Sequence, residues 1–158
     1  MPELSVYRGA VYWMISDYGY QTLNEPGDAD NDIRFQCTAK SGRSYRSQFL
    51  LYPIQRIARV VIHFDLRYHP NRRLFFAEVV HRLNDSVAVL GHFEFHWDSG
   101  QTSFVFGAEV TDPDPETFAT MMNRCAYAIE VWEAASGFFS GRLGADGVVS
   151  VAQMLTEV

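Results

Sequence analysis

The sequence lacks any long hydrophobic run, since no stretch approaches the roughly 18 consecutive apolar residues that a membrane-spanning helix requires. The N-terminal segment MPELSVYRGAVYWMISDYGY also lacks the basic residues followed by an apolar core that mark a secretion signal. We therefore expect a cytoplasmic protein that makes no contact with a membrane.

Basic residues are outnumbered by acidic ones. The chain has 13 Lys and Arg against 19 Asp and Glu, which gives a formal net charge of -6 and a pI near 5.3. Direct binding of DNA or RNA depends on clustered cations that displace counterions from phosphates. The composition therefore disfavours direct nucleic-acid binding and leaves only an indirect association through a protein partner.

Cysteine is scarce as well. Cys37 and Cys125 are far apart in the sequence, and each falls on the apolar side of a predicted strand or helix. A disulfide between them stays open at this point, but free buried thiols agree better with a cytoplasmic protein.

Catalytic signatures are also absent. The sequence has no Gly-x-Ser-x-Gly turn, no His-Glu-x-x-His motif on a helix, and no lysine in P-loop spacing near the glycines of SGFFSGRLGADG. We therefore predict no catalytic residues and no cofactor.

What the chain does contain suits one globular domain: 158 residues, of which 47% are apolar and 15% aromatic. The spacing of apolar residues predicts helices over 4–18, 69–85 and from 114 onward, and strands over 32–39, 45–53, 59–68, 87–98 and 102–110. Because strands follow one another along the chain, we expect an α+β fold, with an antiparallel sheet of about five strands flanked by helices.

Domain boundaries follow from the same pattern. We expect a single α+β domain over residues 1–141 and a C-terminal tail over 142–158 that is a short helix or mobile. The acidic segment 24–31 is rich in Asp, Gly and Pro, so it is predicted to be a solvated loop.

The alternation also predicts which side chains face the core. The residues predicted inward on the strands are Ile33, Phe35, Cys37, Ala39, Phe49, Leu51, Val60, Ile62, Phe64, Leu66, Tyr68, Phe93, Phe95 and Trp97. On the long closing helix the predicted buried stripe is Phe118, Met121, Met122, Cys125, Ile129 and Trp132.

The stretch GHFEFHWDSG permits two interpretations. Its alternation places His92, Glu94, His96 and Asp98 on one side of a strand, where they could form a metal site together with His63 and Asp65 of another strand. However, side chains two residues apart on a strand are separated by almost 7 Å, which is wide for ligands of one ion. We favour an ordinary half-buried strand and keep a metal-binding regulator or enzyme using His92, Glu94 and His96 as the alternative.

Several apolar residues fall on faces that a single layered domain would leave wet. These are Leu50, Tyr52, Leu74, Tyr127, Val131 and Phe138. Such an excess is typical of a protein interface. Arginines cluster in the middle third of the chain, and Arg46 and Arg72 among them could attract an acidic segment.

The run RRLFFAEVVHRLNDSVAVLGHFEFHWDSGQTSFVFGAEV, followed by DPETFATMMNRCAYAIEVWEAASGFF, resembles the YbjN-type proteins. The shared features are a helix that ends near an asparagine, here Asn84, a strand led by a glycine, here Gly91, and a long closing helix with an aromatic residue where Trp132 stands. The resemblance extends over residues 4–141 by element order, and its distinctive part is 72–139.

That family is similar in fold to type III secretion chaperones, which are small, acidic, homodimeric proteins that hold a client segment without ATP. The resemblance implies a twisted sheet, a homodimer and a client protein bound on exposed apolar patches, and it supplies no catalytic residues. The leading hypothesis is therefore a non-enzymatic, chaperone-like adaptor. Its predicted partner-binding or dimer-interface residues are Leu50, Tyr52, Leu74, Arg46 and Arg72.

Overall fold

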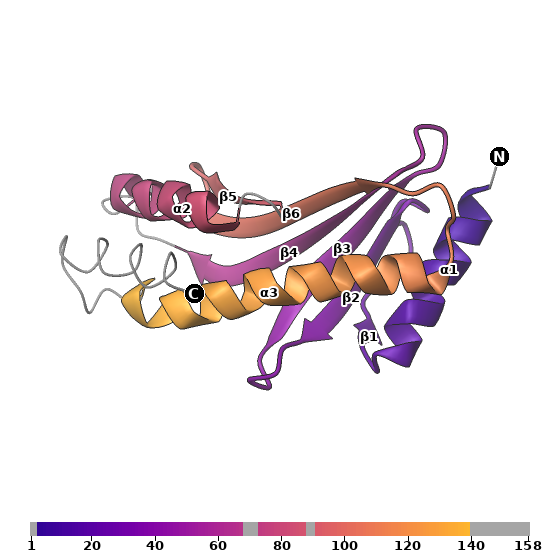
Figure 1. Cartoon of the computed structure of the whole chain (residues 1–158), viewed down its shortest axis with the longest axis horizontal. Helices are drawn as coiled ribbons and strands as arrows, with labels where there is room; N and C mark the ends of the chain where they lie inside the picture. Colours follow the sequence, from indigo (N-terminus) through magenta and orange to yellow (C-terminus); the bar gives the residue numbers. More distant parts are fainter. Residues whose placement is uncertain (1–2, 68–72, 88–90, 140–158) are drawn as a thin grey trace.

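The structure is a computed structural model that describes residues 3–67, 73–87 and 91–139, without the side chains of 65–67, 86–87 and 136–139. Its helices are α1 (Leu4–Asp17), α2 (Arg73–Val87) and α3 (Pro115–Phe139). Its strands are β1 (Gln21–Thr22), β2 (Asp32–Thr38), β3 (Ser44–Tyr52), β4 (Ile57–Arg67), β5 (His92–His96) and β6 (Gln101–Glu109). The predicted α+β class is confirmed (Figure 1).

The strands form one antiparallel sheet of six strands in the order β1-β2-β3-β4-β6-β5. The strand that the prediction missed is β1. It has only two residues, which are too few to show alternation. In the last hairpin, β6 pairs with both β4 and β5, so β5 is the edge strand. None of the described helices is long and apolar enough to cross a membrane.

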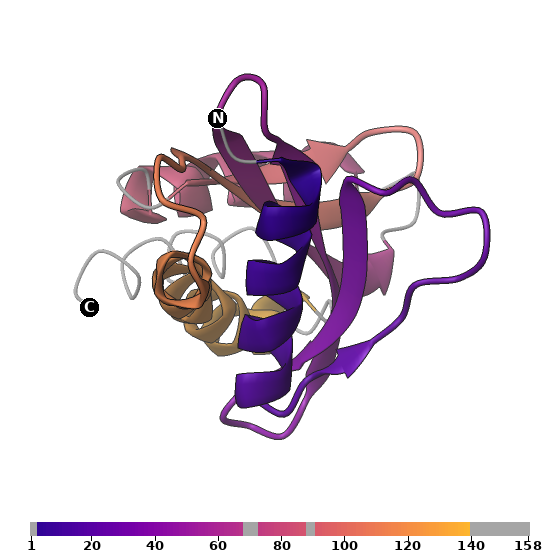
Figure 2. The same cartoon turned by 90° about the vertical axis from the view of Figure 1, so that its right-hand side faces the viewer.

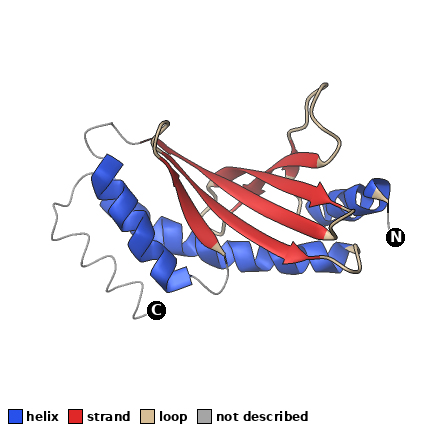
Figure 3. Cartoon of the chain, turned by 90° about the horizontal axis from the view of Figure 1, so that it is seen from above, coloured by secondary structure: helices blue, strands red, loops and turns tan. Residues whose placement is uncertain are grey.

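The core lies between the sheet and the helices. Helices α1 and α3 follow the same side of the sheet (Figures 2 and 3), and α2 packs against β5. The predicted alternation is confirmed on β2, where Ile33, Phe35 and Cys37 are buried. The predicted stripe of α3 is also confirmed, since all six of its residues are buried.

The opposite face of the sheet, over β2, β3 and β4, carries no helix of the described chain (Figure 2). We call this surface the open face. It presents the residues that alternate with the buried ones, including Arg46, Gln48 and Leu50 on β3. A solvated second face is common in antiparallel sheets.

Two predicted exposures are wrong. Trp97 was expected inward but is 53% exposed, because β5 ends at His96 and the chain turns there, with the Gly100 amide donating to the His96 carbonyl at 2.8 Å. Val131 was expected on a wet face but is 5% exposed, because α3 contacts both α1 and the sheet and so buries a wider arc than one stripe. Phe138 lies outside the described side chains.

The thiols of Cys37 and Cys125 are free and buried. Burial raises the pKa of both, that of Cys125 to about 12, against an ordinary value of 9.0. Because the thiolate is the reactive form, we expect the folded protein at pH 8 to react with a thiol reagent at least about 100-fold more slowly than the protein in urea.

The same shifts predict lower stability at alkaline pH. Thiols in the unfolded chain ionise near their ordinary pKa of 9.0, while the buried thiols stay protonated to higher pH. The unfolded state therefore gains stability as the pH rises past about 9, and the free energy of unfolding should fall there.

Rapid labelling of the folded protein by the thiol reagent would contradict the burial of both cysteines.

Candidate functional site

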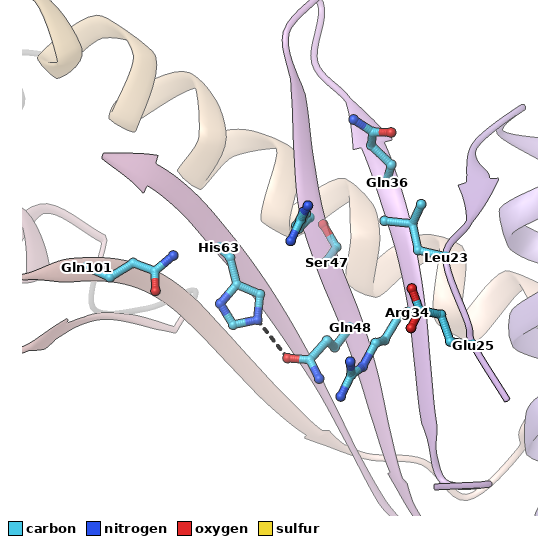
Figure 4. Close-up of a pocket in the computed structure, with 9 residues that line it drawn as sticks. Leu23, Glu25, Arg34, Gln36, Ser47, Gln48, His63 and Gln101 are labelled. Carbon is cyan, nitrogen blue, oxygen red and sulfur yellow. Dashed lines mark hydrogen bonds between the residues drawn. The ribbon is translucent and has the colours of Figure 1, made fainter. Parts of the chain in front are cut away.

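The open face is hollowed into a cavity of about 860 Å³, which we call the trough (Figure 4). It is bounded by the chain just after β1 and by side chains of β2, β3, β4 and β6. The residues that line it are Leu23, Glu25, Arg34, Gln36, Arg46, Ser47, Gln48, His63 and Gln101. Its surface is therefore mainly amide and cationic.

Strand register arranges the open face in rows that cross the sheet. The row through Arg46 contains Gln36, Arg46, His63 and Ser103. The next row along β3 contains Arg34, Gln48, Val61 and Val105, and the one after it contains Asp32, Leu50, Arg59 and Gly107. Members of one row are cross-strand neighbours, so they are close enough to interact.

A chain of hydrogen bonds crosses the sheet from β5 to β2. The His96 Nε2 atom lies 3.1 Å from Ser103 Oγ, which lies 3.3 Å from His63 Nδ1. His63 Nε2 lies 2.6 Å from Gln48 Oε1, and Figure 4 marks this hydrogen bond with a dashed line. The Gln48 amide nitrogen then donates to both carboxylate oxygens of Asp32, at 3.0 and 3.2 Å.

The direction of this chain follows from its ends. The Gln48 nitrogen donates to Asp32, and the Gln48 Oε1 atom faces His63. Because a carboxamide oxygen can only accept, His63 Nε2 carries the proton of this hydrogen bond. With His63 neutral, its Nδ1 accepts from the Ser103 hydroxyl, whose oxygen can accept from His96 Nε2. Ser103 is 1% exposed, so its hydroxyl does not reach a substrate in the trough, and the chain serves to order the polar face.

The histidines of GHFEFHWDSG do not converge on a metal site. His92 Nε2 contacts Glu94 Oε1 at 2.9 Å, whereas His96 contacts Ser103. Strand β6 lies between β4 and β5, so His63 is separated from them by a strand. Among the described side chains, no group of three or more His, Cys, Asp or Glu is placed to hold a metal ion. The side chain of Asp65 lies outside those described.

The arginines of the open face differ in their partners. Arg34 forms ion pairs with Asp32 at 3.1 Å and Asp28 at 3.7 Å, and the hydrogen bond and charge of Asp32 raise the pKa of its guanidinium. By contrast, Arg46 and Arg59 are exposed and form no ion pair with any side chain that the structure describes. They are therefore available to an anionic ligand.

The structure brings together part of the predicted partner-binding set. Leu50 and Tyr52 are half-buried on β3, on the same face as Arg46. Leu74 is 77% exposed, but it lies on α2, which packs against β5 at the far edge of the sheet. Arg72 lies outside the described residues.

Two exposed isoleucines were missed by sequence reasoning. Ile57 is 39% exposed and pairs directly with Tyr52, and Ile54 is 77% exposed in the turn that joins β3 to β4. This end of the open face carries Leu50, Tyr52 and Ile57, and Ile54 lies in the adjoining turn; we call these four apolar residues the ledge. Alternation on β4 could have found Ile57, since Val60 and Ile62 were correctly predicted inward.

Asparagine side chains bond to backbone groups of the edge strand β5 and of β2 beyond the point where β2 pairs with β1. Asn84 at the end of α2 donates to the Phe93 carbonyl at 2.9 Å and accepts from the Phe93 amide at 2.5 Å. On β2, Asn24 accepts from the Arg34 amide at 3.0 Å and donates to the Asp32 carbonyl at 2.8 Å. A partner strand cannot pair at these positions of β2 and β5 without displacing the asparagine side chains.

Comparison of the chain with protein-family models, with curated proteins and with solved structures found no match. The resemblance to YbjN-type proteins therefore stays a prediction from the residue pattern. Function is therefore inferred from the geometry of the trough and the ledge.

Proposed function

We propose that this chain is a non-enzymatic, chaperone-like adaptor that acts as a homodimer and holds an extended segment of a partner protein on the open face of its sheet. The observation that carries the proposal is a sheet face that no described helix covers and on which the trough and the apolar ledge adjoin, because Gln48 of the trough and Leu50 of the ledge are on the same strand. Binding is by mass action, with no chemical step.

The side chains of the trough suit a peptide backbone. The strands β3 and β4 are paired with neighbours on both sides, so a ligand contacts them through side chains. The carboxamides of Gln36 and Gln101 line the trough and make no side-chain hydrogen bond within the described residues. A carboxamide both donates and accepts, which matches the amide groups of an extended chain.

The ledge supplies the apolar part of the contact. Exposed aromatic and aliphatic residues that adjoin a polar rim are typical of binding surfaces, and most of the affinity usually comes from such a central group. Leu50 and Tyr52 are half-buried and therefore already partly ordered before a partner arrives. This reduces the side-chain entropy lost on binding.

A random-peptide display selection against the purified full chain tests the proposal. We expect enriched peptides whose affinity falls at least about tenfold with Leu50→Asp or Tyr52→Asp, because either change places a charge in the apolar contact. The matched control is Trp13→Asp, which changes a 68% exposed aromatic residue on α1 and should leave the affinity unchanged.

Circular dichroism of each variant establishes that it is folded before affinities are compared. Light scattering of the same samples should give about twice the chain mass of 18.0 kDa. If no peptide is enriched, or if the enriched peptides bind Tyr52→Asp as tightly as the parent chain, then the open face is not a protein-binding surface. A monomer mass would contradict the homodimer.

A further inference from the structure

We infer that the bound segment is acidic and carries two carboxylates four residues apart, one held by Arg46 and the other by Arg59. This inference rests on the proposed function and specifies the chemistry of the partner. It follows from the register of β3 and β4, the charge of the open face and the side chains between the two arginines.

Register sets the spacing. Arg46 on β3 is opposite His63 on β4, and Arg59 on β4 is opposite Leu50 on β3. The two arginines are therefore separated along the strands by the length of residues 46–50, which is about 14 Å at 3.4 Å per residue. An extended segment that runs along these strands presents its residues i and i+4 on one face at the same spacing.

Charge identifies the ligand groups as anions. The chain carries a net charge of -6, yet Arg46 and Arg59 are exposed here without an ion pair in the described part of the chain. Three acids lie near this surface: Asp32 bonds to Arg34 and Gln48, Glu25 lines the trough and its charge acts on Arg34, and Glu109 of β6 is opposite Ile57. Arginine binds carboxylates with two parallel hydrogen bonds, so it selects them by geometry as well as by charge.

The side chains between the arginines complete the pattern. The row between them contains Gln48, whose amide is already bonded, and Val61, which is half-buried. Residue i+2 of the segment would face this row and should be small and apolar. Residue i+6 would face Tyr52 and Ile57 of the ledge and should be a larger apolar residue.

The stem of Arg59 lies beside Gly107 of β6. A methyl group built on Gly107 would lie 3.6 Å from Arg59 Cγ, so the arginine stem runs beside the bare backbone of β6. The guanidinium thus stands on the open face with its stem supported on one side. Arg59 is exposed, so its guanidinium is accessible to a ligand.

Four fluorescent nine-residue peptides on a Thr/Val background test the inference against the full chain by anisotropy. Three carry two glutamates spaced by two, four or six residues, and the fourth carries two glutamines spaced by four. We expect the peptide with glutamates four apart to bind about tenfold more tightly than the glutamine peptide and about fivefold more tightly than the other spacings. Raising the salt concentration should reduce the difference.

Arg46→Gln and Arg59→Gln should each weaken the best peptide about fivefold to tenfold and remove the spacing preference. The matched control is Arg124→Gln, an exposed arginine of α3 on the helix side of the sheet, which should change nothing. Glutamine keeps the first methylene groups and a polar end but removes the guanidinium and its charge, and the three arginines are exposed, so loss of folding is not expected.

An absent spacing preference, or one that survives both variants, would overturn the inference. So would tighter binding of a single-stranded oligo(dT), which would identify phosphates as the preferred anions. If the glutamine peptide binds equally well and Tyr52→Asp abolishes that binding, the proposed function stands and only the acidic pattern fails. If the random selection enriches no peptide at all, the proposed function itself fails.

Discussion

Replacing Trp132 with alanine should lower the free energy of unfolding by about 3 to 5 kcal/mol. The indole is 2% exposed and stacks on Phe64 of β4, with ring centroids 4.2 Å apart and planes inclined by 14°. It also lies 6.1 Å from the Phe93 ring of β5. Its loss would leave a cavity where α3 meets two strands of the sheet, and tightly packed cores collapse only partly around such cavities.

Urea unfolding followed by circular dichroism measures this cost. Tyr127→Ala on the same helix is the matched control, because that side chain is 37% exposed and its removal opens no enclosed cavity. We expect the control to change stability by less than about 1 kcal/mol. An equal effect of the two substitutions would contradict the position of Trp132 in the core.

Replacing Gly91 with alanine should destabilise the protein by about 3 kcal/mol, chiefly by loosening β5 from β6. Gly91 has φ of 147°, a conformation that L side chains rarely adopt. A Cβ there would lie 2.4 Å from the Val105 carbonyl oxygen and 2.8 Å from Phe104 Cζ. The carbonyl belongs to β6 and cannot move away without disturbing the sheet, so the glycine is required for close approach of the two backbones.

Gly9→Ala is a control of opposite sign. Gly9 lies within α1, and a Cβ at this position would meet nothing within 4 Å. The substitution should therefore stabilise the helix by about 0.5 to 1 kcal/mol. Amide hydrogen exchange should show faster exchange in β5 for Gly91→Ala alone. If both substitutions changed the free energy of unfolding in the same direction, this would contradict the close contact at Gly91.

Much of the fold could be predicted from the sequence because the apolar pattern is strong where the core is dense. On β2 and β4, alternation correctly identified Phe35, Ile62 and Phe64 as buried. On α3, three-to-four spacing identified the whole buried stripe, and the helix predicted from 114 onward begins there, where Asp114 accepts from the Thr117 amide at 2.8 Å. These signals are local, so they do not depend on the order of strands.

The arrangement of the site could be predicted less well, because register and strand order depend on contacts between distant residues. Either strand of the last hairpin could have paired with β4, and nothing in GHFEFHWDSG distinguishes the two. The order β4-β6-β5 places Ser103 between His63 and His96, and this separates the histidines that could have formed a metal site. Likewise, the pairing of Leu50 with Arg59 depends on the register between β3 and β4, which the sequence of neither strand specifies by itself.

The most direct test of binding on the open face is a two-dimensional amide NMR titration of the isotope-labelled chain with one enriched peptide. The proposal predicts that the amide signals of Gln48, Leu50 and Arg59 shift during the titration, while those of Val6 and Trp13 on α1 stay in place. Shifts at Val6 and Trp13, with the three sheet residues unchanged, would show that partners bind the helix side and would contradict the proposed function.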